Sequence, residues 1–185
     1  SIDPVALDGS SDFPAIWMQR PRDGMNLHWD GNNSSVAERN LSAALGAGVT
    51  PVTVDRAAIH RVEDWMWTLP APAFPAPERI DAAKAARGEE LFADHCAGCH
   101  GMKRQSGYDY SRGRHPGLGE VVPLGAIGTD PGRWASYTPD FAGAQNLLYA
   151  GYPWRFQHFR KTGGYASQPL DGVWATAPYL HNGSV

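Results

Sequence analysis

The residues best suited to chemistry in this chain are two cysteines and a histidine that stand close together. Cys96 and Cys99 are separated by two residues, and His100 follows directly. In such a CxxCH arrangement each thiol can form a thioether with a vinyl group of haem, and the histidine can ligate the iron. The chain has no other cysteine. The pattern therefore predicts one covalently attached haem c, with His100 as the proximal iron ligand.

Two other interpretations of this motif fit less well. A redox-active CxxC pair lies between a strand and a helix and has no need of the histidine. A structural zinc site needs four ligands, and no second Cys/His pair stands at finger spacing. Residues 88–95 (GEELFADH) run directly into Cys96 and resemble the first helix of class I cytochromes c. The haem interpretation is therefore favoured.

The elements expected to position the motif are helices. A helix capped by Thr53 or Asp55 is predicted to end near Leu69, because a proline follows. A second helix, rich in alanine, is predicted to begin at Ile80 and to lead into Cys96. Shorter helices are predicted over residues 38–45, 132–136 and 139–149.

Four prolines between residues 70 and 77 predict a stiff, extended linker. We expect it to separate an N-terminal segment, residues 1–77, from a haem domain, residues 78–185. Gly and Pro are frequent in residues 101–132 and 163–185, which predicts long loops. Because no strand pattern is found, the predicted class is all-α: a class I cytochrome c-like haem domain with long loops, preceded by a partial helical segment.

Composition excludes several classes of partner. The formal net charge is −3 and no basic run occurs, so nucleic acid is not an expected partner. No apolar stretch reaches the roughly 18 residues of a transmembrane helix. Haem c is attached outside the cytoplasmic membrane, and no signal peptide is visible. We therefore expect an exported, periplasmic bacterial protein whose targeting segment has been removed.

Two further segments resemble the bacterial dihaem cytochrome c peroxidase and MauG superfamily. Residues 27–33 (LHWDGNN) resemble its FWDGR-type motif between the two haem sites. Residues 170–183 (LDGVWATAPYLHNG) resemble its TAPYFHSG segment, which follows the second CxxCH. Both segments are closest to the rubber-oxygenase-like branch. The chain thus resembles the part of this superfamily around the second, C-terminal haem.

This resemblance implies a role for particular residues. The CxxCH motif matches the second haem site, which usually transfers electrons. Trp29 matches the tryptophan placed between the two haems, where an aromatic ring assists electron passage. Thr176 and Pro178 match residues whose main-chain carbonyls help to hold a calcium ion, a hard cation that prefers oxygen ligands.

The chain also departs from the superfamily pattern. The first CxxCH is absent. The superfamily places an acidic residue about twenty positions after the inter-haem tryptophan to cleave peroxide by acid–base catalysis, but here residues 46–50 read GAGVT. The superfamily's distal methionine would lie beyond Val185. We therefore expect a piece of a longer protein, and no catalytic residue is assigned.

The sixth iron ligand stays open at this point. A methionine would raise the potential, a histidine would lower it, and an open position would permit small-molecule chemistry. His181 has a suitable chain position within the TAPYLHNG segment and is the candidate distal ligand. Met102 lies too close to His100 in sequence to reach the opposite face easily. His115 is either a haem contact or a residue of a solvated loop. His28 is either a haem contact or a core histidine.

The function expected from these features is electron transfer through one haem c. The chain would form the C-terminal haem domain of a periplasmic dihaem oxidoreductase, with a second haem domain or a redox protein as its partner. One alternative is a haem-dependent enzyme of the peroxidase or oxygenase type, acting on peroxide or O2. Another is a monohaem cytochrome c carrier or a subunit of a larger redox complex.

Overall fold

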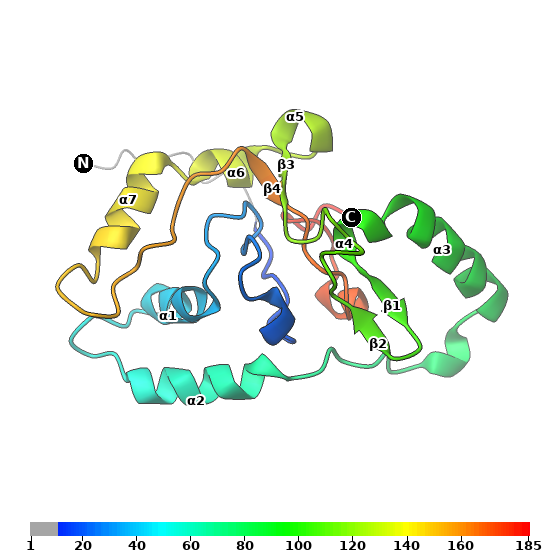
Figure 1. Ribbon diagram of the computed structural model, residues 1–185, viewed down its shortest axis with the longest axis horizontal. Helices are drawn as coiled ribbons and strands as arrows, with labels where there is room; N and C mark the ends of the chain where they lie inside the picture. Colours follow the sequence, from blue (N-terminus) through cyan, green and yellow to red (C-terminus); the bar gives the residue numbers. More distant parts are fainter. Residues whose placement is uncertain (1–10) are drawn as a thin grey trace.

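The computed structural model of the protein describes residues 11–185. Its helical elements are η1 (Arg20–Arg22), α1 (Val36–Gly46), α2 (Arg56–Trp67), η2 (Pro77–Arg79), α3 (Ala82–His95), α4 (Ala97–His100), α5 (Leu124–Ile127), α6 (Gly132–Ser136), α7 (Pro139–Leu147) and η3 (Val173–Thr176). Its strands are β1 (Met102–Arg104), β2 (Gly107–Asp109), β3 (Val121–Pro123) and β4 (Gly164–Ala166). The shape is elongated, with α1, α2 and α7 toward one end and α3, β1 and β2 toward the other (Figure 1).

The strands correct the predicted all-α class. Within the described residues, β1 pairs antiparallel with β2, and β3 pairs antiparallel with β4. Each strand has three residues. A segment of this length is too short to show the period-two alternation by which strands are recognised in a sequence. The fold is therefore helical with two small sheets, and the second sheet joins parts of the chain that are far apart in sequence.

The predicted helices are present, and side-chain caps explain where several begin. Asp55 caps α2, because its carboxylate accepts a hydrogen bond from Ala58 N at 2.9 Å. Asp81 caps α3 by accepting from two main-chain amides at 3.0 Å. Ser35 caps α1 two residues earlier than expected, through Glu38 N at 3.3 Å. Such caps satisfy amides that have no partner inside the helix.

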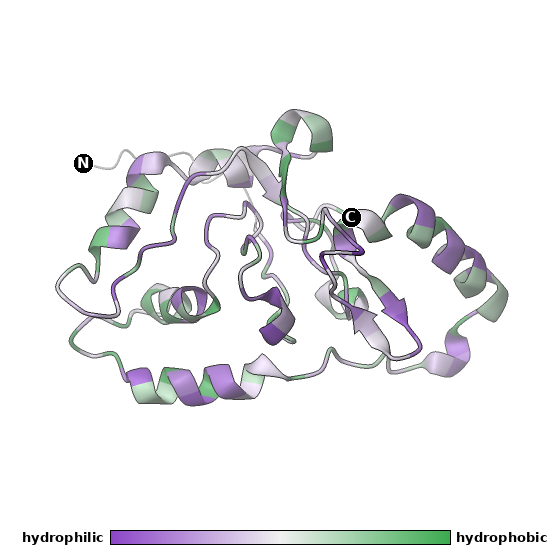
Figure 2. Cartoon of the chain, in the orientation of Figure 1, coloured by the Kyte–Doolittle hydropathy of each residue, from purple (hydrophilic) through white to green (hydrophobic). Residues whose placement is uncertain are grey.

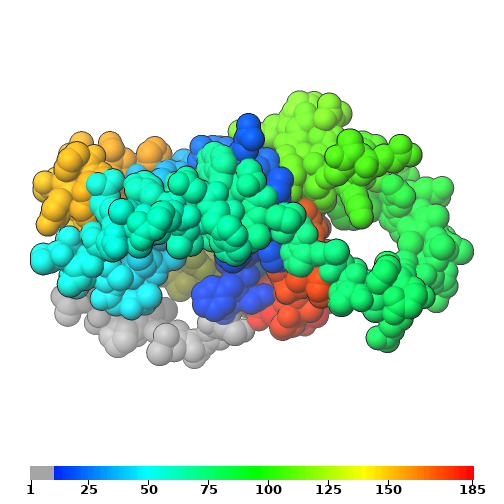
Figure 3. All heavy atoms as spheres, turned by 90° about the horizontal axis from the view of Figure 1, so that it is seen from below, coloured from blue at the N-terminus to red at the C-terminus, as the bar shows by residue number. Residues whose placement is uncertain are grey.

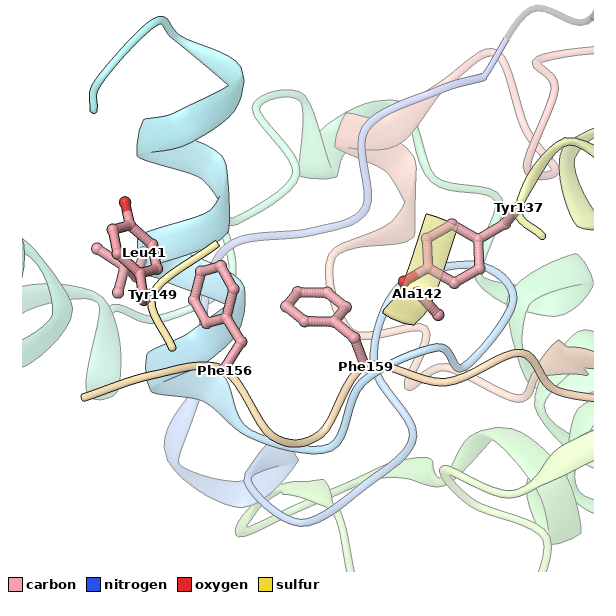
Figure 4. Packing of buried hydrophobic residues seen from close by; sticks show 6 residues of the cluster. All are labelled: Leu41, Tyr137, Ala142, Tyr149, Phe156 and Phe159. Carbon is pink, nitrogen blue, oxygen red and sulfur yellow. The ribbon is translucent and has the colours of Figure 1, made fainter. Parts of the chain in front are cut away.

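Two hydrophobic clusters form the core of the described part. The larger one joins α1, α7 and the segment after α7, and Figure 4 shows its six buried residues: Leu41, Tyr137, Ala142, Tyr149, Phe156 and Phe159. The smaller one contains Met25, Leu27, Val36 and Leu118. Each cluster contains residues from before and after the proline-rich linker. Segments on the two sides of residue 77 therefore pack together, and the two-domain division stays a prediction.

Helix α3 contributes little to either cluster. Of its residues only Phe92 is partly buried, and Leu91 is 51% exposed. Hydrophilic and hydrophobic residues are mixed along it (Figure 2). The space-filling view shows an opening beside the segment that contains the linker and α3 (Figure 3). The main structural role of α3 is thus to position the CxxCH motif, which follows its C-terminal end.

Residues 27–33 form a tight turn that is closed by a hydrogen bond from Leu27 N to Asn33 O at 2.7 Å. His28 and Gly31 adopt left-handed backbone conformations, with φ of 64° and 66°. A Cβ at Gly31 would lie 2.7 Å from Val121 Cγ2. This position therefore requires glycine both for its φ angle and for the close approach of β3.

The His28 side chain is held uncharged by its surroundings. Its ring meets Phe159 edge-on, with 6.3 Å between centroids. No hydrogen-bond partner for Nε2 is found within residues 11–185. Burial, followed by the nearby charges of Arg39 and Arg133, lowers the pKa of His28 from 6.5 to about 4. Neutral imidazole is therefore the form that the folded chain accepts.

This pKa shift predicts a pH-dependent stability. The unfolded chain takes up the proton at higher pH than the folded chain. The stability that neutral His28 contributes is therefore fully present above pH 6.5 and is lost as the pH falls toward about 4. We expect the free energy of unfolding of the native chain to fall by up to about 1.4 kcal/mol per pH unit more than that of His28→Asn over this window. Urea unfolding of both proteins across the window measures the difference.

The exposed His60, on α2, provides the matched control. His60→Asn is expected to keep the pH dependence of the native chain. Equal slopes for the native chain and His28→Asn would show that the His28 imidazole is not held neutral.

Candidate haem site

The CxxCH motif lies at the junction of two helices. Cys96 ends α3, and α4 carries Cys99 and His100. Both thiols are free, with Cys96 partly buried and Cys99 exposed, so neither is occupied by a disulfide. Gly101 ends α4 with φ of 74°, and a Cβ there would lie 2.7 Å from Asp109 O. The glycine thus allows the chain to turn sharply after the histidine.

The His100 ring is oriented by a main-chain carbonyl. Its Nδ1 lies 2.8 Å from Gln168 O. A carbonyl oxygen can only accept, so Nδ1 carries the donated proton, and Nε2 is the nitrogen left to ligate a metal in the neutral tautomer. Histidines that ligate metals are commonly fixed in this way, through the nitrogen that does not bind the metal. The arrangement fits a proximal ligand of haem iron.

A second contact ties the same two segments together. The Tyr108 hydroxyl, from β2, donates to His100 O at 2.6 Å and accepts from Leu170 N at 3.0 Å. Burial raises the pKa of Tyr108 to about 12, so the hydroxyl keeps its proton for this role. The Gln168 side chain in turn donates to Asn26 O at 2.7 Å. Residues 168–170 thereby link the histidine to the turn at residues 27–33.

A cavity of about 560 Å³ lies against His100. This volume is within the range of sites for small molecules and cofactors. Much of its wall is apolar, including Ile127, Ala166, Pro169, Leu170, Val173 and Leu180. The two cysteines are not part of the lining. A histidine on the wall of a predominantly apolar cavity of this size fits a porphyrin, and iron held there would supply one-electron redox chemistry.

His181 lines the same cavity as His100. It is 5% exposed and stacks on Tyr165, with 4.2 Å between ring centroids. Its Nε2 has no hydrogen-bond partner in the described part of the chain, although Asp130 Oδ1 lies 3.8 Å away. Burial lowers the pKa of His181, which favours the neutral imidazole that a metal requires. His115 instead lies 3.3 Å from Asp109 Oδ2 and lines neither this cavity nor the next.

Trp29 lines this cavity and also a second one of about 670 Å³. Its indole Nε1 donates to Asp12 O at 2.6 Å, and its carbonyl accepts from Ala166 N at 2.8 Å. The second cavity is lined by His28, Arg39, Arg133 and several apolar residues from α1 and α2. The tryptophan is thus a shared wall between two compartments.

The two residues expected at a calcium site lie close to the haem cavity. Thr176 ends η3 and lines the cavity, while Pro178 follows after a cis Ala177–Pro178 bond and does not. Between residues 11 and 185 no group of three or more His, Cys, Asp or Glu side chains could hold a metal ion. Calcium there would depend on carbonyl oxygens, and its presence stays a prediction.

The structure also shows a buried charged group that the sequence did not indicate. Arg22 and Asp171, on the wall of the haem cavity, form an ion pair in which their side chains are 2% and 3% exposed. The Tyr110 hydroxyl donates to Asp171 Oδ2 at 2.6 Å. Because the two charged residues are 149 positions apart in the sequence, only the folded chain reveals their pairing.

Comparisons with known proteins agree with this site. Residues 85–168 match the family model for cytochrome c, and residues 164–185 match the model described as RoxA-like, cytochrome c-like. The first match contains Cys96, Cys99 and His100, and the second contains His181. No helix within residues 11–185 combines the length and apolar character needed to cross a membrane.

Two uncharacterized proteins of Sinorhizobium fredii are similar to the chain. The protein y4iM is 30% identical over 203 residues, which covers 95% of this chain and 42% of that protein. The protein y4iJ is 29% identical over 150 residues, which covers 57% of this chain and 25% of that protein. The chain therefore spans less than half the length of either relative.

The motif, the orientation of its histidine and the family matches lead to one conclusion. The C-terminal haem region of this chain resembles RoxA-like, dihaem cytochromes c, and its match to the cytochrome c family implies covalently bound haem c.

Proposed function

We propose that this chain is the C-terminal haem part of a periplasmic dihaem oxidoreductase and passes electrons between its own haem and a second redox centre. The observation that carries this proposal is the position of Trp29, which lines both the cavity of His100 and the second cavity. An aromatic ring held in place between two cavities offers a path for electrons, because the ring itself need not move when an electron passes.

The second cavity has features that suit a redox partner group. It is similar in volume to the first and combines apolar walls with two cations, Arg39 and Arg133. Arginines bind carboxylates through paired hydrogen bonds, so the cavity can accept a planar apolar group that carries acids. The larger part of both relatives lies outside the matched region, which is enough chain for a second haem domain.

A haem count and one substitution test this proposal. In the full-length protein we expect two haems per polypeptide, measured as the pyridine haemochrome against protein concentration. Trp29→Leu should keep both haems and slow electron transfer between them, followed after laser-flash reduction. Trp65→Leu, at a position of α2 that is 60% exposed, is the control and should change neither quantity. A single haem, or an unchanged rate in Trp29→Leu, would overturn the proposal.

We further propose that His181 is the distal ligand of the haem that His100 holds. Both histidines line one cavity, and the pKa of His181 is lowered by burial, so a neutral imidazole is available. Two strong ligands suit electron transfer, whereas an open iron would favour the alternative of an enzyme that uses O2 or peroxide.

Carbon monoxide distinguishes these two states. We expect the absorption spectrum of the dithionite-reduced native protein to stay unchanged at this haem when carbon monoxide is added. In His181→Ala the Soret band should shift, because the sixth position is open. His115→Gln, which alters a buried histidine outside the cavity, should behave like the native protein. A shift in the native protein at this haem would instead favour small-molecule chemistry.

A further inference from the structure

Arg22 is a buried cation with an unused hydrogen-bond donor. It ends η1, is 2% exposed and lines the cavity of His100. A guanidinium has five N–H donors in a fixed plane. One amino group of Arg22 donates to Asp171, but Nε has no partner among residues 11–185. Burying such a donor unpaired costs free energy, so a ligand that accepts from it would stabilise the folded chain.

We propose that Arg22 anchors a propionate of the haem, and that Asp171 and Tyr110 are positioning residues that hold the guanidinium in place. The inference concerns only the haem attached to Cys96 and Cys99. It does not depend on a second haem or on the identity of the sixth ligand.

The chemistry of the cavity supports this assignment. A haem brings two carboxylates into a space whose wall is largely apolar, and a buried carboxylate needs a cation and hydrogen bonds. Of the described residues that line this cavity, Arg22 is the only arginine or lysine. Its paired N–H groups match the geometry of a carboxylate better than a point charge would.

The groups behind Arg22 are arranged to fix its orientation. Asp171 binds the guanidinium through Oδ1, while its Oδ2 accepts from the Tyr110 hydroxyl at 2.6 Å. The carbonyl of Asp171 accepts from Trp17 Nε1 at 2.8 Å. Both ends of Asp171 are thus held, and the remaining donors of Arg22 have a defined direction.

A cation at this position also affects the iron. A buried positive charge is weakly screened. It favours the reduced haem, which carries one positive charge fewer than the oxidised haem. The Arg22 side chain should therefore raise the midpoint potential of the haem, and the carboxylate of Asp171 should lower it.

The test uses the haem-loaded chain and two readouts. We expect Arg22→Gln to lower the midpoint potential and to shift the propionate bending band in the resonance Raman spectrum. Arg22→Lys should retain part of the potential but still shift the band, because the paired donors are lost. Arg20→Gln, which removes an exposed arginine of the same turn, is the matched control and should leave both readouts unchanged.

Two more variants separate anchoring from a structural role. Asp171→Asn should raise the potential. If Arg22→Gln alone does not fold because it leaves Asp171 buried and unpaired, the double variant Arg22→Gln/Asp171→Asn removes both charges together. A propionate band shifted in the folded single or double Arg22 variant supports the anchor. A band that stays in its native position in that variant overturns it, whatever the potential does.

Discussion

The haem site depends on one hydrogen bond, from His100 Nδ1 to the carbonyl of Gln168. It places a proton on Nδ1 and leaves Nε2, the other ring nitrogen, for a metal. The bond also joins two segments that are 68 positions apart, and the side chain of the same Gln168 reaches Asn26. One residue therefore connects the haem motif, the C-terminal segment and the turn that contains Trp29. An acceptor that is a main-chain atom cannot be lost by substitution, although its position can shift.

Local features of this chain could be predicted from the sequence, because short-range rules govern them. The cap Asp55, the prolines after α2 and the CxxCH spacing each act within a few residues. The resemblance of residues 170–183 to a family motif placed His181 among the candidates, and the fold brings His181 to the cavity of His100. In each case the information is carried by residues that are near one another in sequence.

The parts that escaped prediction are those that distant segments create together. The strands β3 and β4 are three residues long and meet only in the folded chain. No alternation of apolar and polar residues therefore indicates them in the sequence. Arg22 and Asp171 find one another across 149 positions. The packing between segments before and after residue 77 also arises only in the folded chain. The prolines indicate the linker, but not the contacts made by the segments on its two sides.

The stretch from Gln168 to Asp171 has a consequence for how this fold can vary. Within four consecutive positions it supplies the acceptor for His100, the amide that binds Tyr108 and the carboxylate that pairs with Arg22. The spacing of these groups along the chain matches the positions of their three partners, His100, Tyr108 and Arg22. Inserting or deleting one residue here would displace all three contacts at once, whereas the exposed parts of the linker can change length independently. Evolution can therefore alter the sequence of this stretch more readily than its length.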